Sequence, residues 1–383
     1  MDRQFRHAQL AKTTHDEQAL QDFVQSFKLH LARKVVAGNR TVFEKRAAPV
    51  FEEQNGQEPQ TREEVAEAMG EQPYYQMWSG LQRVSQDMNW NAAADCVARQ
   101  LPDLIEISKS WDQPLGSLTL DPDIEVPRYI SAVDIHCLPG SYHVETVDDD
   151  LAQGAIFDKG GYVYSMGGWG PKIDAMGQGV VDYLKEAFPD FRPVRILDLG
   201  CTIGGSTLPY VDAYPEAEIY AIDVAAPCLR YAHSRAEAFG KAVHFVQDNA
   251  EYTKFEDESF DLVVSHILMH ETSNRAIRNI LRECRRLVRP LGITAHVDLA
   301  GFRHWDAFDQ FMLSWDTINN NEPFWNAYRE MHPHELMREA GFEEATIFEA
   351  LIARKAGKNS AFVKGRNSGG RGFWEVFGAR RTP

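Results

Sequence analysis

The sequence contains no run of 18 apolar residues, so we expect no membrane-spanning helix and no membrane partner. Its five cysteines are scattered and form no C-x-x-C pair, which indicates a reducing compartment, and we expect the cytoplasm. The first 21 residues carry charges throughout, which argues against a signal peptide. The chain also lacks the internal repeats that would indicate a solenoid or a propeller.

The sequence is short of cations, with 40 Lys and Arg residues against 56 Asp and Glu and a formal net charge of −16. Binding to a phosphate backbone requires clustered cations, so nucleic acid is an unlikely partner on composition alone. The exception is the connector 354–371, which holds six cations and no acidic residue. It could bind an anionic substrate or RNA, although a solvated loop has the same composition.

A length of 383 residues favours two domains, and the composition divides the chain. Residues 1–107 are predicted to form a helical domain. The capping pairs at 14–17 and 61–64 each come before apolar residues at helical spacing. Residues 108–171 contain the prolines and glycines that are typical of a linker.

The second half of this linker is unusual. The stretches 129–138 and 141–147 have the composition of strands. Within 160–171, five glycines alternate with three aromatic residues. Such a segment could form a lid over a flat ligand, or it could be an irregular connector whose rings pack on the core, and the sequence leaves both interpretations open.

From residue 172 to residue 383, short apolar runs alternate with amphipathic helical patterns. This alternation predicts an α/β fold with a doubly wound, mostly parallel sheet. The predicted strands lie at 194–199, 218–223, 243–247, 260–266 and 293–299. An inserted segment at about 300–333 follows, and 344–354 and 372–379 predict a closing antiparallel hairpin.

The first of these strands leads into the pattern D-x-G-x-T-x-G, formed by Asp198, Gly200, Thr202 and Gly204. Glycines let the backbone turn sharply and leave room for a ligand to lie against it. A dinucleotide site would favour G-x-G-x-x-G and a bare helix N-terminus. A carboxylate two residues before the first glycine suits a ligand with an ammonium group, and Thr202 fits this loop if its φ is negative.

This pattern resembles the first motif of the class I methyltransferases that use S-adenosylmethionine, in which glycine is more common at the position of the threonine. The resemblance continues with Asp223 at the end of the second strand, where the family binds the ribose hydroxyls. After the third strand it assigns Asn249, rather than Asp248, and Ala250 to the adenine ring. His266, at the tip of the fourth strand, is the last residue assigned to the cofactor.

The fourth strand is followed by His270 and Glu271. Ligands of open α/β sheets bind beyond the carboxyl ends of the strands, so these side chains are predicted to face the reacting methyl group. Histidine can remove a proton from a hydroxyl acceptor at neutral pH, and Glu271 would assist it. The alternative is that His270 packs beneath the next helix. We expect no metal, since four further candidates lack a recognised ligand spacing: His296, Asp298, His304 and Asp306.

The resemblance implies a cytoplasmic methyltransferase that uses S-adenosyl-L-methionine and acts on a small-molecule acceptor, either a metabolite or a natural product. The helical domain would cover the substrate side of the sheet, within one chain or across a homodimer. The alternatives are an RNA or protein methyltransferase, a nicotinamide-dependent oxidoreductase, and a non-catalytic scaffold with the same fold. The sequence identifies neither the acceptor nor the atom that receives the methyl group.

Overall fold

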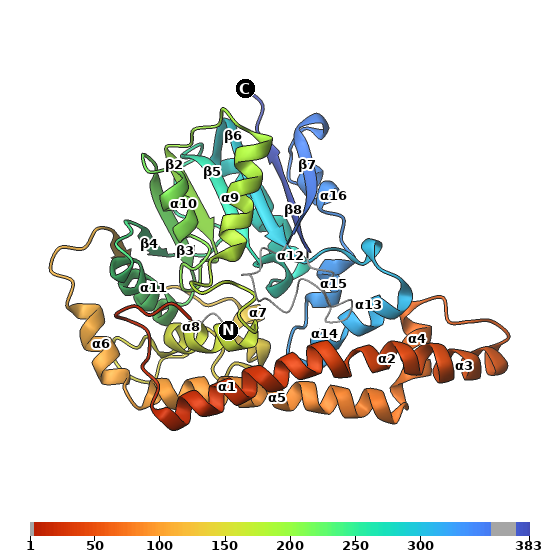
Figure 1. Cartoon of the computed structure of the whole chain (residues 1–383). Coiled ribbons are helices and arrows are strands. Elements are labelled where there is room, and N and C mark those ends of the chain that lie inside the picture. Colours follow the sequence, from red (N-terminus) through yellow and green to blue (C-terminus); the bar gives the residue numbers. More distant parts are fainter. Residues whose placement is uncertain (1–3, 354–372) are drawn as a thin grey trace.

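The computed structural model describes residues 4–353 and 373–383, and it is built around one eight-stranded sheet (Figure 1). The strands are β1 (Ser117–Thr119), β2 (Arg195–Leu199), β3 (Glu218–Asp223), β4 (His244–Gln247), β5 (Phe260–His266), β6 (Val288–Asp298), β7 (Ile347–Ala353) and β8 (Phe373–Arg380). Their order across the sheet is β1-β4-β3-β2-β5-β6-β8-β7. Only the β6–β8 and β7–β8 pairs are antiparallel. The predicted doubly wound, mostly parallel sheet with a closing hairpin is therefore confirmed.

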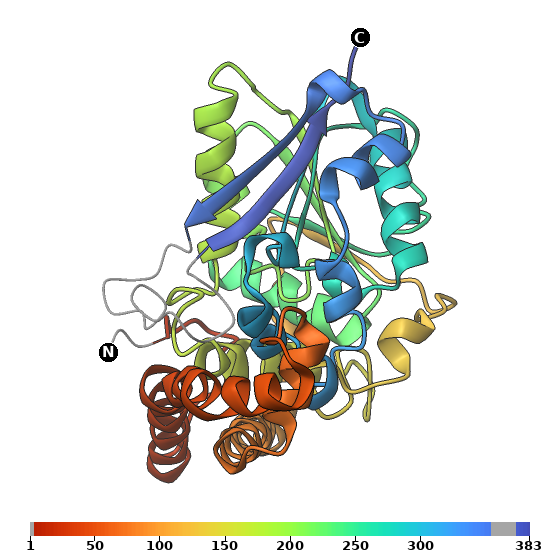
Figure 2. The same ribbon diagram turned by 90° about the vertical axis from the view of Figure 1, so that its right-hand side faces the viewer.

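Helices cover both faces of this sheet. Figure 2 shows α9 (Ala175–Ala187) on one side and α12 (Asn274–Leu287) with α16 (Pro333–Glu339) on the other. The helix α12 begins where the Ser273 side chain accepts a hydrogen bond from the backbone N–H of Ala276. Its apolar residues point at the sheet and join the largest buried cluster, which includes residues of β2, β5 and β6. The order reverses between β2 and β5, and ligands of such sheets bind at that point.

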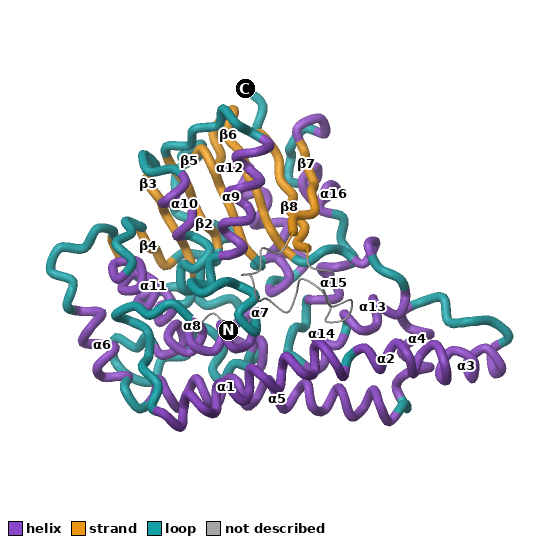
Figure 3. The backbone as a smooth tube through the Cα atoms, viewed as in Figure 1, coloured by secondary structure: helices purple, strands orange, loops and turns teal. Residues whose placement is uncertain are grey.

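The N-terminal part is helical, as predicted. It contains α1 (His15–His30), α2 (Ala37–Val42), α3 (Ala48–Asn55), α4 (Arg62–Gly70), α5 (Pro73–Ala98) and α6 (Leu101–Lys109), with π-helical turns at Leu31–Val35 and Phe43–Ala47. Both predicted capping boxes are present, at Thr14 and at Thr61. In Figure 3, α1 and α5 run side by side beneath the carboxyl ends of the parallel strands. The helices are thus positioned to close the ligand-binding edge of the sheet.

The predicted strands at 129–138 and 141–147 are wrong. These residues form the short helix α7 (Arg128–Ser131), a 3-10 turn at Ile135–Cys137 and further turns. His136 and Cys137 have φ angles of 57° and 60°, which an extended strand cannot contain. A strand does form earlier in the predicted linker, where β1 extends the sheet beside β4.

The glycine- and aromatic-rich segment 160–171 packs against the core. Its first residues complete α8 (Ala152–Tyr164), and a Cβ on Gly160 would lie 2.6 Å from the ring of Trp90 in α5. The glycine therefore allows close packing between helices. One buried cluster joins Trp90 with Ala155 of α8 and Tyr231 of α11 (Ala226–Ala238), so the helical part and the sheet share a core. No helix among the described residues is long and apolar enough to cross a membrane.

Candidate active site

Two adjoining pockets lie at the carboxyl ends of the parallel strands. The first, here called the strand-tip pocket, is lined by the loops after β2 to β5, including Gly200, Asp223 and Asn249. The second, here called the tryptophan pocket, lies toward the N-terminal helices and is lined by five of the chain's eight tryptophans: Trp78, Trp169, Trp315, Trp325 and Trp374. His136 and Ile267 line both pockets, so they form the wall between them.

Six of the eight residues predicted to bind the cofactor line the strand-tip pocket: Gly200, Thr202, Asp223, Asn249, Ala250 and His266. The expected negative φ of Thr202 is wrong, because its φ is 48°. The Thr202 backbone N–H donates to Asp223 Oδ2 at 2.9 Å, which holds the loop in this conformation. The first loop and the tip of β3 are therefore fixed to each other.

Asp198 and Gly204 are not among the residues that line the strand-tip pocket, and their contact with a ligand stays a prediction. The Asp198 carboxylate is buried, accepts a hydrogen bond from Thr207 Oγ1 at 2.6 Å and pairs with His266 Nδ1 at 3.1 Å. It therefore orients His266. Gly204 has a φ of 68° and packs against Phe245, where an added Cβ would lie 3.1 Å from the ring.

The Asp223 carboxylate at the end of β3 is the main electrostatic feature of the strand-tip pocket. Burial raises its pKa to about 6, against the effect of the backbone N–H groups of Ala225 and Thr202. Both N–H groups donate to it at 2.9 Å. A carboxylate can accept more than these two hydrogen bonds, for example from hydroxyl groups of a ligand.

Asp248 and Asn249, the two candidates for the adenine position, both line the strand-tip pocket. The Asp248 carboxylate accepts hydrogen bonds from the backbone N–H groups of Asn249 and Lys254, each at 2.9 Å. The Asn249 side-chain oxygen accepts from the backbone N–H of Glu251 at 2.9 Å. Asp248 therefore shapes the loop after β4 with both of its oxygens, whereas Asn249 uses one of its two polar groups in this way.

The predicted catalytic residues lie on the 3-10 turn η4 (Met269–Glu271) and face different pockets. His270 lines the tryptophan pocket, and Glu271 lines the strand-tip pocket. His270 is buried, and its Nδ1 lies 2.6 Å from Oδ1 of Asp298 at the end of β6. Burial alone would lower the pKa of His270, but the charge and hydrogen bond of Asp298 raise it above its usual value.

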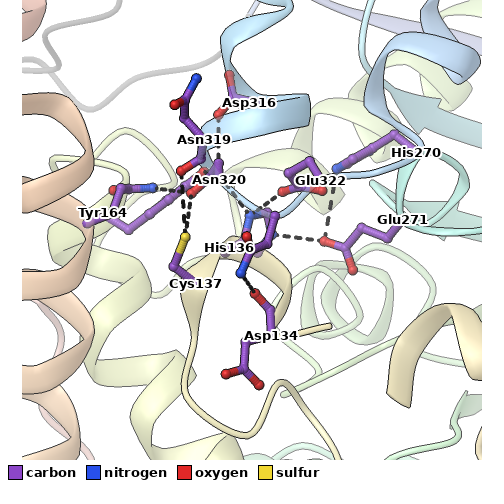
Figure 4. A network of polar contacts seen from close by, with 12 residues as sticks. Asp134, His136, Cys137, Tyr164, His270, Glu271, Asp316, Asn319, Asn320 and Glu322 are labelled. Carbon is purple, nitrogen blue, oxygen red and sulfur yellow. Dashed lines mark hydrogen bonds and ion pairs between the residues drawn. The ribbon is translucent and has the colours of Figure 1, made fainter. Parts of the chain in front are cut away.

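His136, which the sequence did not identify, completes a polar group at the wall between the pockets (Figure 4). Its Nε2 lies 2.9 Å from Glu271 Oε1, and its Nδ1 forms an ion pair with Glu322. The Tyr142 hydroxyl donates to the same Glu271 oxygen at 3.1 Å. No pattern in the sequence connects residues 136, 271 and 322, because three separate turns bring them together.

The tryptophan pocket also holds buried charged groups. Lys28 of α1 contacts Gln86, and burial lowers its pKa to about 7. Burial likewise lowers the pKa of Arg329 to about 10 and raises that of Asp316 to about 7. These residues belong to α1 and to the inserted segment, which contains α14 (Trp315–Asn319) and α15 (Trp325–Arg329). The cationic connector 354–371 lies outside the described residues.

Part of the sheet region is similar to known methyltransferases. Residues 196–292 match the family model described as a methyltransferase domain. A malonyl-[acyl-carrier protein] O-methyltransferase of Methylococcus capsulatus is 39% identical over 103 residues, which are 26% of this chain and 35% of that protein. A demethylmenaquinone methyltransferase of Thermus thermophilus is 39% identical over 71 residues, 18% of this chain and 32% of that protein.

The similarity is confined to part of each protein, since the chain spans 35%, 39% and 41% of the length of the first three curated relatives. Among solved structures, the Haemonchus contortus phosphoethanolamine N-methyltransferase 2 in complex with S-adenosyl-L-methionine aligns with 18% identity and a TM-score of 0.40. The alignment covers 54% of this chain and 52% of that one.

Proposed function

We propose that this chain, which belongs to the class I S-adenosylmethionine-dependent methyltransferases, binds that cofactor in the strand-tip pocket and methylates a small molecule held in the tryptophan pocket. The observation that carries the proposal is that the two pockets adjoin and share His136 and Ile267 as their wall. A methyl group at the edge of one pocket therefore faces the other. S-adenosylmethionine supplies an activated methyl group on a sulfonium.

The chemistry of the strand-tip pocket fits this cofactor. The Asp223 carboxylate, which lines this pocket, would accept hydrogen bonds from the two ribose hydroxyls. Asn249 and Ala250 would contact the adenine ring. Gly200 and Thr202, both with positive φ, would bring the backbone of the first loop close to the amino-acid part of the cofactor.

The tryptophan pocket suggests the class of acceptor. Its five indole rings favour a flat or largely apolar molecule, since such surfaces bind mainly by burial and ring stacking. Lys28 and Arg329 add cations that would pair with an acidic group. We therefore propose an apolar organic acid as the acceptor. The burial of these groups disfavours an RNA or protein acceptor, which would need an open surface.

His270 and Glu271 would act on opposite sides of the pocket wall. Asp298 holds Nδ1 of His270, which leaves Nε2 to receive the acceptor proton and stabilises the imidazolium that forms. Glu271 holds His136 in the wall and would assist through it. The transfer is an in-line displacement, so much of the rate would come from the alignment of the acceptor with the methyl group.

Two measurements test the proposal. Calorimetric titration of the full chain with S-adenosylhomocysteine is expected to show one site, whereas NADH is expected not to bind. Binding of NADH alone would favour the oxidoreductase alternative. Incubation with metabolite pools and labelled S-adenosylmethionine is expected to label a small acidic product. Cofactor binding without any transfer would favour a scaffold.

The remaining predictions concern the cellular compartment and the oligomeric state. All five cysteines are free thiols, which supports a reducing compartment such as the cytoplasm.

Leu20 and Phe23 on α1 are exposed, which leaves an apolar face that a second copy of the chain could cover. We propose a homodimer on this face, and light scattering of the full chain and of a Phe23→Glu variant tests it. Equal masses, both monomeric, would contradict it.

A further inference from the structure

Three metal-ligand side chains converge at the wall between the two pockets (Figure 4). The ligand atoms of His136, Glu271 and Glu322 all lie within 4.8 Å of one another. Around one ion with bonds of about 2.1 Å, ligand atoms lie about 3.3–4.2 Å apart. Glu271 and Glu322 contact different ring nitrogens of His136, so one carboxylate would move to the nitrogen that binds the ion. His136 and Glu322 are 5% and 1% exposed. The group is therefore positioned by the protein interior.

The charges of this group call for a cation. The Glu322 side chain is buried, and its partner among the described residues is Nδ1 of His136, with which it forms an ion pair. Buried carboxylates are normally paired with a cation or bound to a metal. The two carboxylates have one imidazole between them, whereas a divalent ion would neutralise both.

His270 lies beside this group but does not belong to it, because the ligand atoms that all lie within 4.8 Å of one another are those of His136, Glu271 and Glu322. His270 Nε2 lies 3.9 Å from Glu271 Oε1, and its Nδ1 lies 2.6 Å from Asp298 Oδ1. In Figure 4 this ring is directed toward Glu271. His270 can therefore act as a base next to an ion that the other three side chains bind.

We propose that His136, Glu271 and Glu322, here called the junction cluster, bind one divalent transition-metal ion. One imidazole and two carboxylates suit Zn²⁺, Fe²⁺, Co²⁺ or Mn²⁺, and the absence of thiolates disfavours soft ions such as Cu⁺. His136 lines the tryptophan pocket, so an open coordination position would face the acceptor. The inference departs from the sequence-based expectation of no metal.

The role of this ion rests on the proposed function, although its binding does not. The ion would hold the acceptor through an oxygen or a sulfur atom and favour its anionic form. The acceptor proton would pass to Nε2 of His270, and the electron pair of the heteroatom would form the bond to the methyl carbon. The carbon–sulfur bond of the sulfonium would break with its pair on sulfur. The acceptor would then be a hydroxyl or thiol compound.

The test uses the untagged full chain after treatment with a chelator and dialysis. Titration with Co²⁺ is expected to give one equivalent per chain with visible d–d bands, and Zn²⁺ is expected to abolish them. Glu322→Gln keeps the shape of the side chain and removes its charge, and it is expected to weaken Co²⁺ binding at least tenfold. The matched control is His15→Asn, since His15 and Asp16 form an exposed pair of similar chemistry.

S-adenosylhomocysteine affinity separates this inference from the proposed function, because Glu322 lines neither pocket. Glu322→Gln is expected to bind it normally, which also shows that the variant is folded. If the wild-type chain takes up no stoichiometric Co²⁺, Zn²⁺ or Mn²⁺, the proposal is wrong and His136 is an imidazolium between two carboxylates. Stoichiometric Co²⁺ that is lost in Glu322→Gln supports the site even if the chain binds no S-adenosylhomocysteine, and the proposed function alone then fails.

Discussion

Removal of the Asp223 carboxylate tests the cofactor assignment most directly. Its two oxygens accept hydrogen bonds from the backbone N–H groups of Thr202 and Ala225 and would also accept the ribose hydroxyls. Asp223→Ala leaves those hydroxyls without a charged acceptor and releases the first loop. Such losses cost about 1–3 kcal/mol of binding, so we expect the affinity for S-adenosylhomocysteine to fall roughly 5- to 150-fold.

The assay is calorimetric titration, and the matched control lies on the same strand. Glu218 begins β3, opposite the end that carries Asp223, and its carboxylate pairs with Arg195 at the surface. Exposed pairs of this kind contribute little, so Glu218→Ala is expected to bind S-adenosylhomocysteine like the wild type. Equal affinity of Asp223→Ala and Glu218→Ala would refute the ribose assignment.

The pH dependence supplies a second criterion for the same residue. The pKa of Asp223 in the free protein is about 6, and only the charged carboxylate can accept from both hydroxyls. Affinity should therefore be constant above pH 6 and fall by up to about tenfold per unit below it, because bound ligand favours the deprotonated form. Asp223→Ala should lack this decrease. A decrease of the same size in both proteins would assign it to another group.

Two further substitutions test the tryptophan pocket and its base. His270→Ala is expected to lower kcat by about 10²–10⁴-fold without change in S-adenosylhomocysteine affinity, and a near-normal kcat would leave alignment alone as the mechanism. Lys28→Met is expected to raise KM for an acidic acceptor while cofactor affinity holds. Because burial lowers the pKa of Lys28 to about 7, the wild type should lose stability as pH falls through 10 toward 7, and Lys28→Met should lose less. If the stability of the variant depended on pH as that of the wild type does, Lys28 would not be the group responsible for this dependence.

The sheet could be predicted from the sequence because its signals are local. The apolar runs of β3 and β5 were located at Glu218–Asp223 and Phe260–His266, with the bounds that the structure gives. The glycines after β2 and the capping boxes at Thr14 and Thr61 are also properties of a few neighbouring residues. Such patterns depend on backbone preferences and burial, which a single segment expresses without help from the rest of the chain.

The parts that were wrong depend on contacts between distant segments. The partners of Asp198, which are His266 and Thr207, could not be predicted from its own segment. Thr202 takes a positive φ because its N–H bonds to Asp223, 21 residues later. His136 lies in a stretch with the composition of a strand. Its place between the two pockets depends on ion pairs with Glu271 and Glu322, which are distant in the sequence.

The two pockets are formed by different parts of the chain, and this limits what the acceptors of the relatives indicate about the acceptor of this chain. Most of the strand-tip pocket, including Gly200, Asp223 and Asn249, lies within residues 196–292, the part that matches the methyltransferase domain model. Of the residues that line the tryptophan pocket, only Ile267 and His270 lie within it. An acceptor in the tryptophan pocket, as proposed, would therefore be contacted almost entirely by segments outside the part that matches that model. The acceptors in the names of the relatives thus do not transfer to this chain, and its own Lys28, Arg329 and indole rings are the better guide.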